Sequence, residues 1–256
     1  MHFTLCTHPR DTREASGSGF TLCHMAYRIG KDSRLYRNGL GGNVRGGLIS
    51  VSDLGMEEDT VCSDELLYEI ERECNLRGFE GIVFDFERSP AGFAMNFIYH
   101  AAIYFSGLGM TVYVPEAFAQ AAPSAVILIS SAVTGGSCAE SYRNTVLKYS
   151  PERLALVYEP ICMDFIMPSP SGKDDYITQN QLDSLIAREH AVSYFSQELC
   201  AYYFTYRDSG SKSHFVLYDD ENSMLKKLGL ARDCGFKQAF LLYPEAYGVL
   251  DVLKEI

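Results

Sequence analysis

The feature of this sequence that most constrains its fold is an alternation of short apolar runs with longer stretches of helical periodicity. Runs rich in β-branched and aromatic residues predict strands, whereas apolar residues spaced three and four apart predict one buried face of a helix. The predicted strands span residues 3–6, 20–27, 48–51, 81–87, 111–114, 126–130, 154–158, 161–167, 201–206, 215–218 and 238–243. The predicted helices span residues 63–77, 90–106, 140–149, 179–189 and 223–234.

This alternation predicts parallel β-α-β units, which either close into a barrel or form an open doubly wound sheet. More than eight strands are predicted, so at least one belongs to a hairpin, and the best pair is 201–206 with 215–218. A length of 256 residues is typical of a (β/α)8 barrel, and no repeat or linker divides the chain. We therefore predict an α/β fold, a single (β/α)8 TIM-type barrel domain spanning residues 1–256.

The charge balance excludes two classes of partner. The formal net charge is −11, from 22 basic and 33 acidic side chains. Nucleic acid and an anionic membrane would both repel such a surface, and no apolar run approaches the roughly 20 residues that span a bilayer. The N-terminal segment lacks a basic region followed by an apolar one, so we expect no export signal. These features predict an intracellular protein with no nucleic-acid partner and no membrane insertion.

The eight cysteines lie far apart, and no C-x-x-C pair occurs. In a chain expected to be intracellular, this spacing predicts reduced, buried thiols rather than disulfides or a metal framework. Three histidines near the N-terminus, with Cys6 and Cys23 between them, match no zinc-ligand spacing. We predict no metal site and no cofactor.

The segment most informative about chemistry is 80–87, Glu-Gly-Ile-Val-Phe-Asp-Phe-Glu. Alternate residues of a strand share a face, so Val83, Asp85 and Glu87 are expected to point the same way. Acids that end an apolar strand cost free energy unless something uses them, and the carboxyl ends of barrel strands are where catalytic groups gather. Apolar surroundings and a neighbouring carboxylate both favour a protonated acid near neutral pH, as a general acid requires. Spacing alone leaves open that both acids only accept hydrogen bonds at the barrel rim.

The same segment resembles the catalytic strand of glycoside hydrolase family 18, the chitinase and N-acetylglucosaminidase barrels. The family pattern is D-G-x-D-x-D-x-E. Gly81, Asp85 and Glu87 match it in register, Phe86 is aromatic where the family usually has an aromatic residue, and Glu80 stands in place of the first acid.

Two further segments extend this resemblance over residues 80–245. Residues 218–227, Tyr-Asp-Asp-Glu-Asn-Ser-Met-Leu-Lys-Lys, resemble the Y-D-D-x-x-S-x-x-x-K stretch that opens the last helix in these barrels. Residues 161–165, Ile-Cys-Met-Asp-Phe, resemble the family's strand that bears Met, Tyr and Asp near the substrate.

The resemblance implies a substrate-assisted, retaining hydrolysis next to an N-acetylglucosamine residue. By position, Glu87 would protonate the leaving oxygen. Asp85 would orient the 2-acetamido group, whose carbonyl is the nucleophile, and stabilise the oxazolinium. The remaining residues implied to contact the sugar are Met163, Asp164, Tyr203, Tyr206 and Tyr243.

Three departures from the family pattern bear on activity. Val83 replaces the middle acid, which in the family helps to set the charge of the acid two residues on. Phe165 stands where the family has a tyrosine hydroxyl, which Tyr203 or Tyr206 could replace from a neighbouring strand. The chain has no Trp, so a short glycan or peptidoglycan suits it better than long chitin chains.

Two alternatives to the hydrolase remain open: a catalytically idle barrel that binds N-acetylated glycans, and an unrelated barrel whose rim acids hold a metal. Short family members without a leader occur in spore-forming bacteria, so the resemblance implies the cytoplasm or the spore coat as the location. An N-acetylated glycan is the expected partner, and the sequence does not specify an oligomeric state.

Overall fold

A computed structural model of the chain describes residues 1–38, 44–57, 60, 63–87, 92–168 and 175–255. The chain groups into two compact units. The first, here called the barrel unit, consists of Met1–Ile129, Ser150–Val157 and Phe236–Ile256. The second, here called the insert unit, consists of Ser130–Tyr149 and Tyr158–Gly235. The single domain predicted over residues 1–256 stays a prediction. The structure divides those residues into the two units just described.

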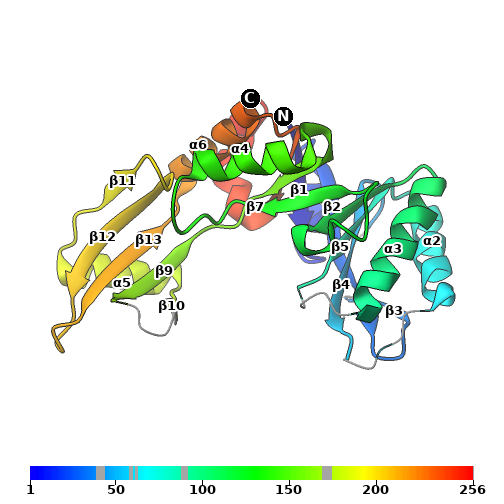
Figure 1. Cartoon of the computed structure of the whole chain (residues 1–256), viewed down its shortest axis with the longest axis horizontal. Helices are drawn as coiled ribbons and strands as arrows, with labels where there is room; N and C mark the ends of the chain where they lie inside the picture. Colours follow the sequence, from blue (N-terminus) through cyan, green and yellow to red (C-terminus); the bar gives the residue numbers. More distant parts are fainter. Residues whose placement is uncertain (39–43, 58–59, 61–62, 88–91, 169–174, 256) are drawn as a thin grey trace. The chain divides into compact units, whose positions relative to one another are not determined.

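The barrel unit is built on eight strands that close into a barrel (Figure 1). Their order is β1, β14, β8, β7, β6, β5, β4 and β2, and a pairing of β1 with β2 completes the ring. The predicted (β/α)8-type barrel is therefore confirmed. The strands are β1 (His2–Thr7), β2 (Thr21–Gly30), β4 (Leu48–Gly55), β5 (Gly81–Asp85), β6 (Thr111–Pro115), β7 (Val126–Ser130), β8 (Leu154–Val157) and β14 (Gln238–Leu242), and β3 (Leu35–Arg37) pairs antiparallel with β2.

The inside of the barrel is filled by side chains, as expected of this architecture. One cluster takes a residue from almost every strand: Cys23, Leu48, Val83, Tyr113, Val126, Ala155 and Phe240, with Cys6, Leu128 and Val157 packed against it. A Cβ at Gly81 would lie 2.7 Å from the backbone oxygen of Thr111 and 2.9 Å from Leu48 Cδ2. Glycine is therefore required at the start of β5 because its neighbours already occupy that space.

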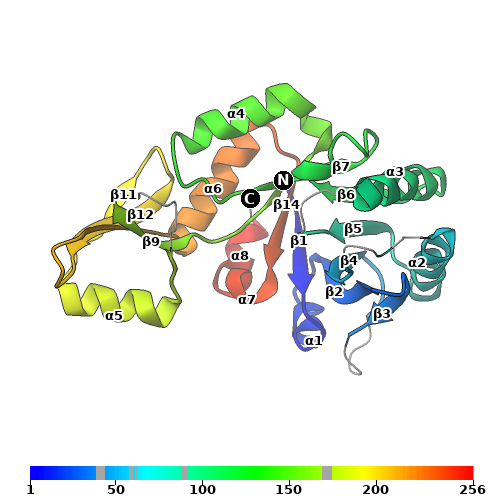
Figure 2. The same ribbon diagram turned by 60° about the horizontal axis from the view of Figure 1, so that its bottom comes forward.

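Two long helices cover the outer face of the strands around β5, α2 (Asp64–Arg77) and α3 (Gly92–Gly107). They lie side by side in Figure 2. Helix α2 has acidic residues in its first turn and is capped at its end by Gly78, whose φ of 69° is the left-handed conformation that glycine favours at helix ends. The predicted start of α3 at Pro90 lies outside the described residues. Shorter helical turns are α1 (Thr12–Ala15), η1 (Glu116–Phe118), η2 (Pro151–Arg153), α7 (Tyr243–Ala246), η3 (Tyr247–Val249) and α8 (Leu250–Leu253).

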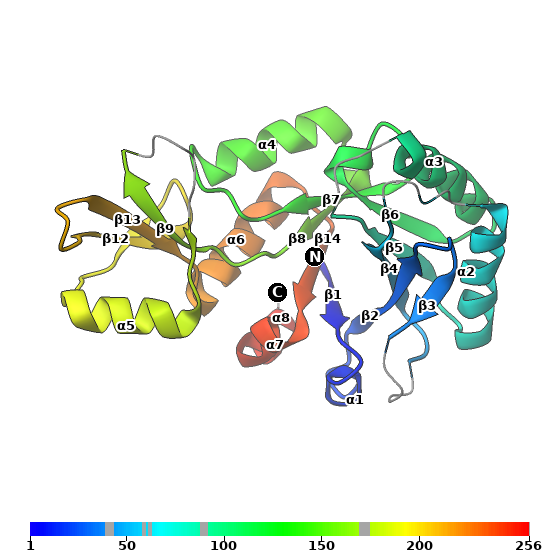
Figure 3. The same cartoon turned by 90° about the horizontal axis from the view of Figure 1, so that it is seen from below.

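The insert unit contains a five-stranded antiparallel sheet in the order β10, β9, β13, β12, β11. Helix α5 (Gln179–Glu189) runs along one face of this sheet in Figure 3, and α4 (Cys138–Tyr149) packs with α6 (Glu221–Cys234) in the same unit. The predicted hairpin of 201–206 with 215–218 is confirmed by β12 and β13. The strands are β9 (Cys162–Met167), β10 (Asp175–Tyr176), β11 (Tyr194–Ser196), β12 (Ala201–Arg207) and β13 (Ser213–Tyr218).

The insert sheet corrects one part of the sequence analysis. The strand predicted at residues 161–167 is present as β9, but residues 161–165, which resemble a substrate-lining strand of the family, lie in the insert sheet, where β9 pairs antiparallel with β10 and β13. The chain leaves the barrel at the end of β8, Val157, and Pro160 lies between the two strands. Among the described residues, no helix combines the length and the apolar character needed to cross a membrane.

Candidate active site

The carboxyl end of β5 carries the two acids singled out in the sequence. Val83 is only 5% exposed and packs in the barrel interior. Asp85, two residues on and so on the same face, is half-buried. The strand ends there, and Glu87 follows it in an exposed position. The site thus has one acid at the end of the inner face and one just beyond the strand.

Phe86, between the two acids, is fixed in the core outside the barrel wall. Its ring stacks on Phe97 with centroids 6.3 Å apart and meets Phe84 and Phe118 edge to face at 5.7 and 5.8 Å. Aromatic pairs of this kind stabilise beyond the area that they bury. The packing of the Phe86 ring therefore fixes the backbone between Asp85 and Glu87, although β5 ends at Asp85.

Asp53 is a residue of this site that sequence reasoning missed. It lies on β4, is 3% exposed, and its Oδ1 accepts a hydrogen bond of 3.2 Å from the Glu87 backbone nitrogen. Sequence spacing carries no signal for it, because Asp53 contacts Glu87 from another strand and the register pairs Ser52, not Asp53, with Asp85. Through this hydrogen bond, Asp53 on β4 positions the backbone of Glu87, which follows β5.

The immediate surroundings of Asp85 are polar on one side and thiol-lined on the other. Ser52 is its register partner on β4, and its charge reaches the Cys23 thiol, whose pKa it helps to raise. Glu80 precedes β5, is exposed, and donates its backbone N–H to the Gly47 oxygen at 2.8 Å. Glu80 therefore lies at the amino end of the strand, where it cannot replace the missing carboxylate at Val83.

Asp164 lies in the insert unit, in a hydrogen-bonded cluster on β9, β12 and β13. Its Oδ2 accepts from the Tyr206 hydroxyl at 2.7 Å, and its Oδ1 lies 2.9 Å from His214 Nδ1. The Tyr206 and His214 rings stack at 4.4 Å, and His214 Nε2 lies 3.6 Å from Asp208 Oδ2. Burial and the Asp164 carboxylate raise the pKa of Tyr206, so that its hydroxyl stays a donor.

The other predicted binding residues occupy different surfaces. Met163 is buried on the opposite face of the insert sheet from Asp164. Tyr203, on the same face as Met163, stacks on Phe215 with centroids 5.4 Å apart. Tyr243 belongs to the barrel unit, where it is 5% exposed at the first position of α7 and meets Tyr247 edge to face at 5.9 Å. Of the predicted residues, Asp164 and Tyr206 are thus in direct contact.

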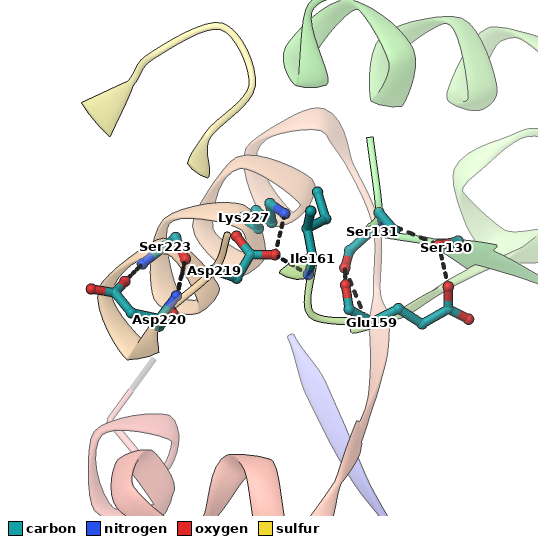
Figure 4. Close-up of polar contacts among 9 residues, drawn as sticks. Ser130, Ser131, Glu159, Ile161, Asp219, Asp220, Ser223 and Lys227 are labelled. Atoms are coloured by element: carbon teal, nitrogen blue, oxygen red, sulfur yellow. Dashed lines mark hydrogen bonds and ion pairs between the residues drawn. The ribbon is translucent and has the colours of Figure 1, made fainter. Parts of the chain in front are cut away.

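Within residues 218–227, the side chains of Asp219, Ser223 and Lys227 are buried in the insert unit, where Figure 4 shows their polar contacts. Asp219 Oδ2 accepts from Lys227 Nζ at 2.6 Å and from the Ile161 backbone nitrogen at 2.9 Å. Asp220 and Ser223 form the capping box that opens α6. These residues support the fold locally, which accounts for their pattern without any contact to a substrate.

The described residues contain no cluster of three or more His, Cys, Asp or Glu side chains arranged to hold a metal ion. The seven cysteines among them are all free: Cys6, Cys23, Cys74, Cys138, Cys162, Cys200 and Cys234.

No family model and no curated protein matches this sequence, but solved structures do. The Bacillus megaterium QM B1551 spore cortex-lytic enzyme SleL is 16% identical over 98% of this chain and 73% of its own, with a TM-score of 0.66. The chitinase from Chromobacterium violaceum ATCC 12472 is 15% identical over 94% and 93%, with a TM-score of 0.67. The chain has the chitinase fold. A mutant GH18 chitinase from Cycas revoluta in complex with (GlcNAc)4 agrees, at 10% identity over 99% and 97% and a TM-score of 0.65.

In this chitinase-type barrel, β5 is the fourth strand along the chain after β1, β2 and β4. Asp85 and Glu87 therefore stand at the carboxyl end of the fourth barrel strand, on the side where barrel enzymes place their catalytic groups. Identities of 10% to 16% establish the fold and leave the chemistry to be tested.

Proposed function

We propose that this chain is a glycoside hydrolase of the family 18 type, which cleaves the bond next to an N-acetylglucosamine residue. The observation that carries the proposal is the pair Asp85 and Glu87 at the carboxyl end of β5 in a chitinase-type barrel. The substrate class is supported by two structural neighbours, a spore cortex-lytic enzyme and a chitinase that holds (GlcNAc)4. The proposed substrate is a chitin oligosaccharide or peptidoglycan, and the proposed location is the cytoplasm or the spore coat.

In the proposed mechanism the substrate supplies its own nucleophile. Glu87, exposed just beyond β5, donates a proton to the leaving glycosidic oxygen. The acetamido carbonyl oxygen attacks the anomeric carbon and forms an oxazolinium, while Asp85 accepts the acetamido N–H and stabilises the positive charge. Water then opens the ring as Glu87 takes back a proton, so that the configuration is retained.

Sugar contacts beyond the two acids stay a proposal for Met163, Asp164, Tyr203, Tyr206 and Tyr243. Because Met163 and Tyr203 lie on the opposite face of the insert sheet from Asp164 and Tyr206, only one of these two pairs can face a given sugar. Because the Tyr206 hydroxyl is already donated to Asp164, Tyr203 is the better of the two tyrosines to donate to a ligand. An N-acetylated glycan is the proposed partner.

The second candidate function is an inactive barrel that binds N-acetylated glycans. The observation that favours it is Val83, which places an apolar side chain in the barrel interior where the family pattern has an acid. The Val83 side chain cannot supply the charge that the family's middle acid supplies at this position.

Hydrolysis of a fluorogenic chitobioside, a chitotrioside and purified peptidoglycan tests the proposal. We expect turnover by the parent chain and a loss of about 10²-fold to 10⁴-fold in kcat for Glu87→Gln, since that change removes the proton donor. Glu80→Gln is the matched control, because Glu80 is an exposed acid at the other end of the same strand, and its rate should equal that of the parent.

Turnover that survives in Glu87→Gln would contradict the assigned role. Binding of the oligosaccharides by calorimetry, without turnover of any of the three substrates, would identify the glycan-binding candidate instead. Activity that a chelator abolishes would favour the metal-dependent alternative.

A further inference from the structure

Two thiols meet inside the barrel, next to the candidate active site. Cys6 on β1 and Cys23 on β2 are direct register partners in a parallel pair of strands. Both belong to the group of side chains that fills the barrel interior, so both point inward. Both cysteines are free, and the Cys6 thiol helps to raise the pKa of Cys23.

We infer that Cys6 and Cys23 are a dithiol modification site, which a small-molecule disulfide converts into a disulfide between neighbouring barrel strands. The geometry allows this bond. Neighbouring strands lie about 4.7–4.9 Å apart, and disulfide-bonded cysteines have Cα atoms about 4.4–6.8 Å apart. The spacing of neighbouring strands therefore falls within the range of Cα separations seen in disulfides.

The two thiols differ in exposure, and this difference determines which of them reacts first with a disulfide reagent. Cys6 is partly exposed, whereas Cys23 is 1% exposed. The neighbouring Cys6 thiol, burial and the charge of Asp85 all raise the pKa of Cys23, so Cys23 is the less reactive of the two thiols. Reagents in solution therefore meet Cys6 first, and Cys23 acts as the resolving thiol.

The reaction with oxidised glutathione proceeds in two exchanges. The Cys6 thiolate attacks one sulfur of the reagent, forms a mixed disulfide and releases one glutathione thiolate, which takes up the proton that Cys6 lost. Cys23 then loses its proton and attacks Cys6 Sγ as the thiolate, which expels the second glutathione as a thiolate that takes up a proton. Two protein thiols are oxidised, and one glutathione disulfide is reduced to two thiols.

The bond would change the electrostatic surroundings of Asp85, since the charge of Asp85 helps to raise the pKa of the Cys23 thiol. Oxidation removes both thiol protons from the neighbourhood of that carboxylate. This effect on activity rests on the proposed hydrolase function. If that function holds, oxidation should change the rate of glycan hydrolysis, and reduction of the disulfide should restore it.

Mass spectrometry of the intact, folded chain tests the site independently of any activity. The chain is incubated with excess oxidised glutathione, its remaining thiols are blocked with N-ethylmaleimide, and it is digested without reduction. We expect a Cys6–Cys23 linked peptide, lighter by two hydrogens than the sum of its parts and absent after dithiothreitol treatment. In Cys23→Ser, Cys6 should accumulate the glutathione adduct.

Cys138 and Cys200 provide an internal control, because they lie near each other in the insert unit but are both buried, at 0% and 6% exposure. They should stay reduced under the same treatment. A glutathione adduct on Cys6 without the linked peptide, no reaction at either thiol, or faster linkage of Cys138 to Cys200 would overturn the inference. A chain that forms the linked peptide but hydrolyses no glycan would support the site and reject the proposed function.

Discussion

Neighbouring residues of β2 have opposite environments, as the two-residue period of a strand requires. Cys23 points into the barrel, and His24 points outward, where it is 1% exposed and its ring lies 5.7 Å from that of Phe79. Burial lowers the pKa of His24, although the backbone of the neighbouring loop opposes this shift. His24 is therefore held neutral in the folded chain.

This burial predicts a pH dependence of stability. Between pH 6.5 and the lower pKa of folded His24, the unfolded chain binds a proton that the folded chain does not, so stability falls as the pH falls. We expect the wild-type chain to lose on the order of 1 kcal/mol more than His24→Phe between pH 7.5 and 5.5, as measured by urea unfolding.

His100 is exposed on α3, so His100→Gln is the matched control and should follow the wild-type profile. Equal losses in the wild type and His24→Phe would show that His24 does not titrate with unfolding.

At the level of secondary structure, periodicity predicted most strands and helices but could not name the partners of each strand. Residues 154–158 and 161–167 look alike in sequence, yet the first is the barrel strand β8 and the second is β9 of the insert sheet. In the candidate site, too, spacing along one strand predicted some residues but not the contacts between strands. Alternation along β5 predicted Asp85 and Glu87, whereas Asp53 binds through the Glu87 backbone and carries no spacing signal. His214 was missed because its partner Asp164 lies 50 residues away.

The buried ion pair of α6 predicts a large effect from a single substitution. Lys227→Met leaves the Asp219 carboxylate, which is fully buried, without its cation. We expect a loss of about 3–5 kcal/mol in the free energy of unfolding. The double variant with Asp219→Asn should recover much of this loss, since the asparagine oxygen still accepts from the Ile161 backbone nitrogen.

Lys226→Met is the control, because Lys226 is exposed and lies over the Phe195 ring. It should cost about 0.5–1 kcal/mol. A cost for Lys227→Met no greater than this, in the same chemical denaturation measurement, would contradict the role of the pair.

At the scale of the whole chain, the barrel is closed by strands from its two ends. Strand β1 pairs with β14 and with β2, so the first and last strands are interior members of a ring. Terminal segments often exchange their amide hydrogens by local fraying, but strands of a closed barrel have no edge from which to fray.

Native-state hydrogen exchange should therefore place β1 and β14 with β5 among the slowest amides. We expect opening free energies for the three strands that agree within about 1 kcal/mol. Exchange of β1 that is much faster than that of β5 would show that the ring opens at the β1 seam.

The side chains that fill the barrel interior determine by which route protons reach the candidate site. Val83, Leu48, Tyr113 and Phe240 fill the barrel below it, packed with Cys23 and Cys6 in the same cluster. A barrel filled in this way is a packed core and not a pore. Protons must therefore reach and leave Asp85 and Glu87 at the carboxyl ends of the barrel strands. A sugar would enter the candidate site from the same end.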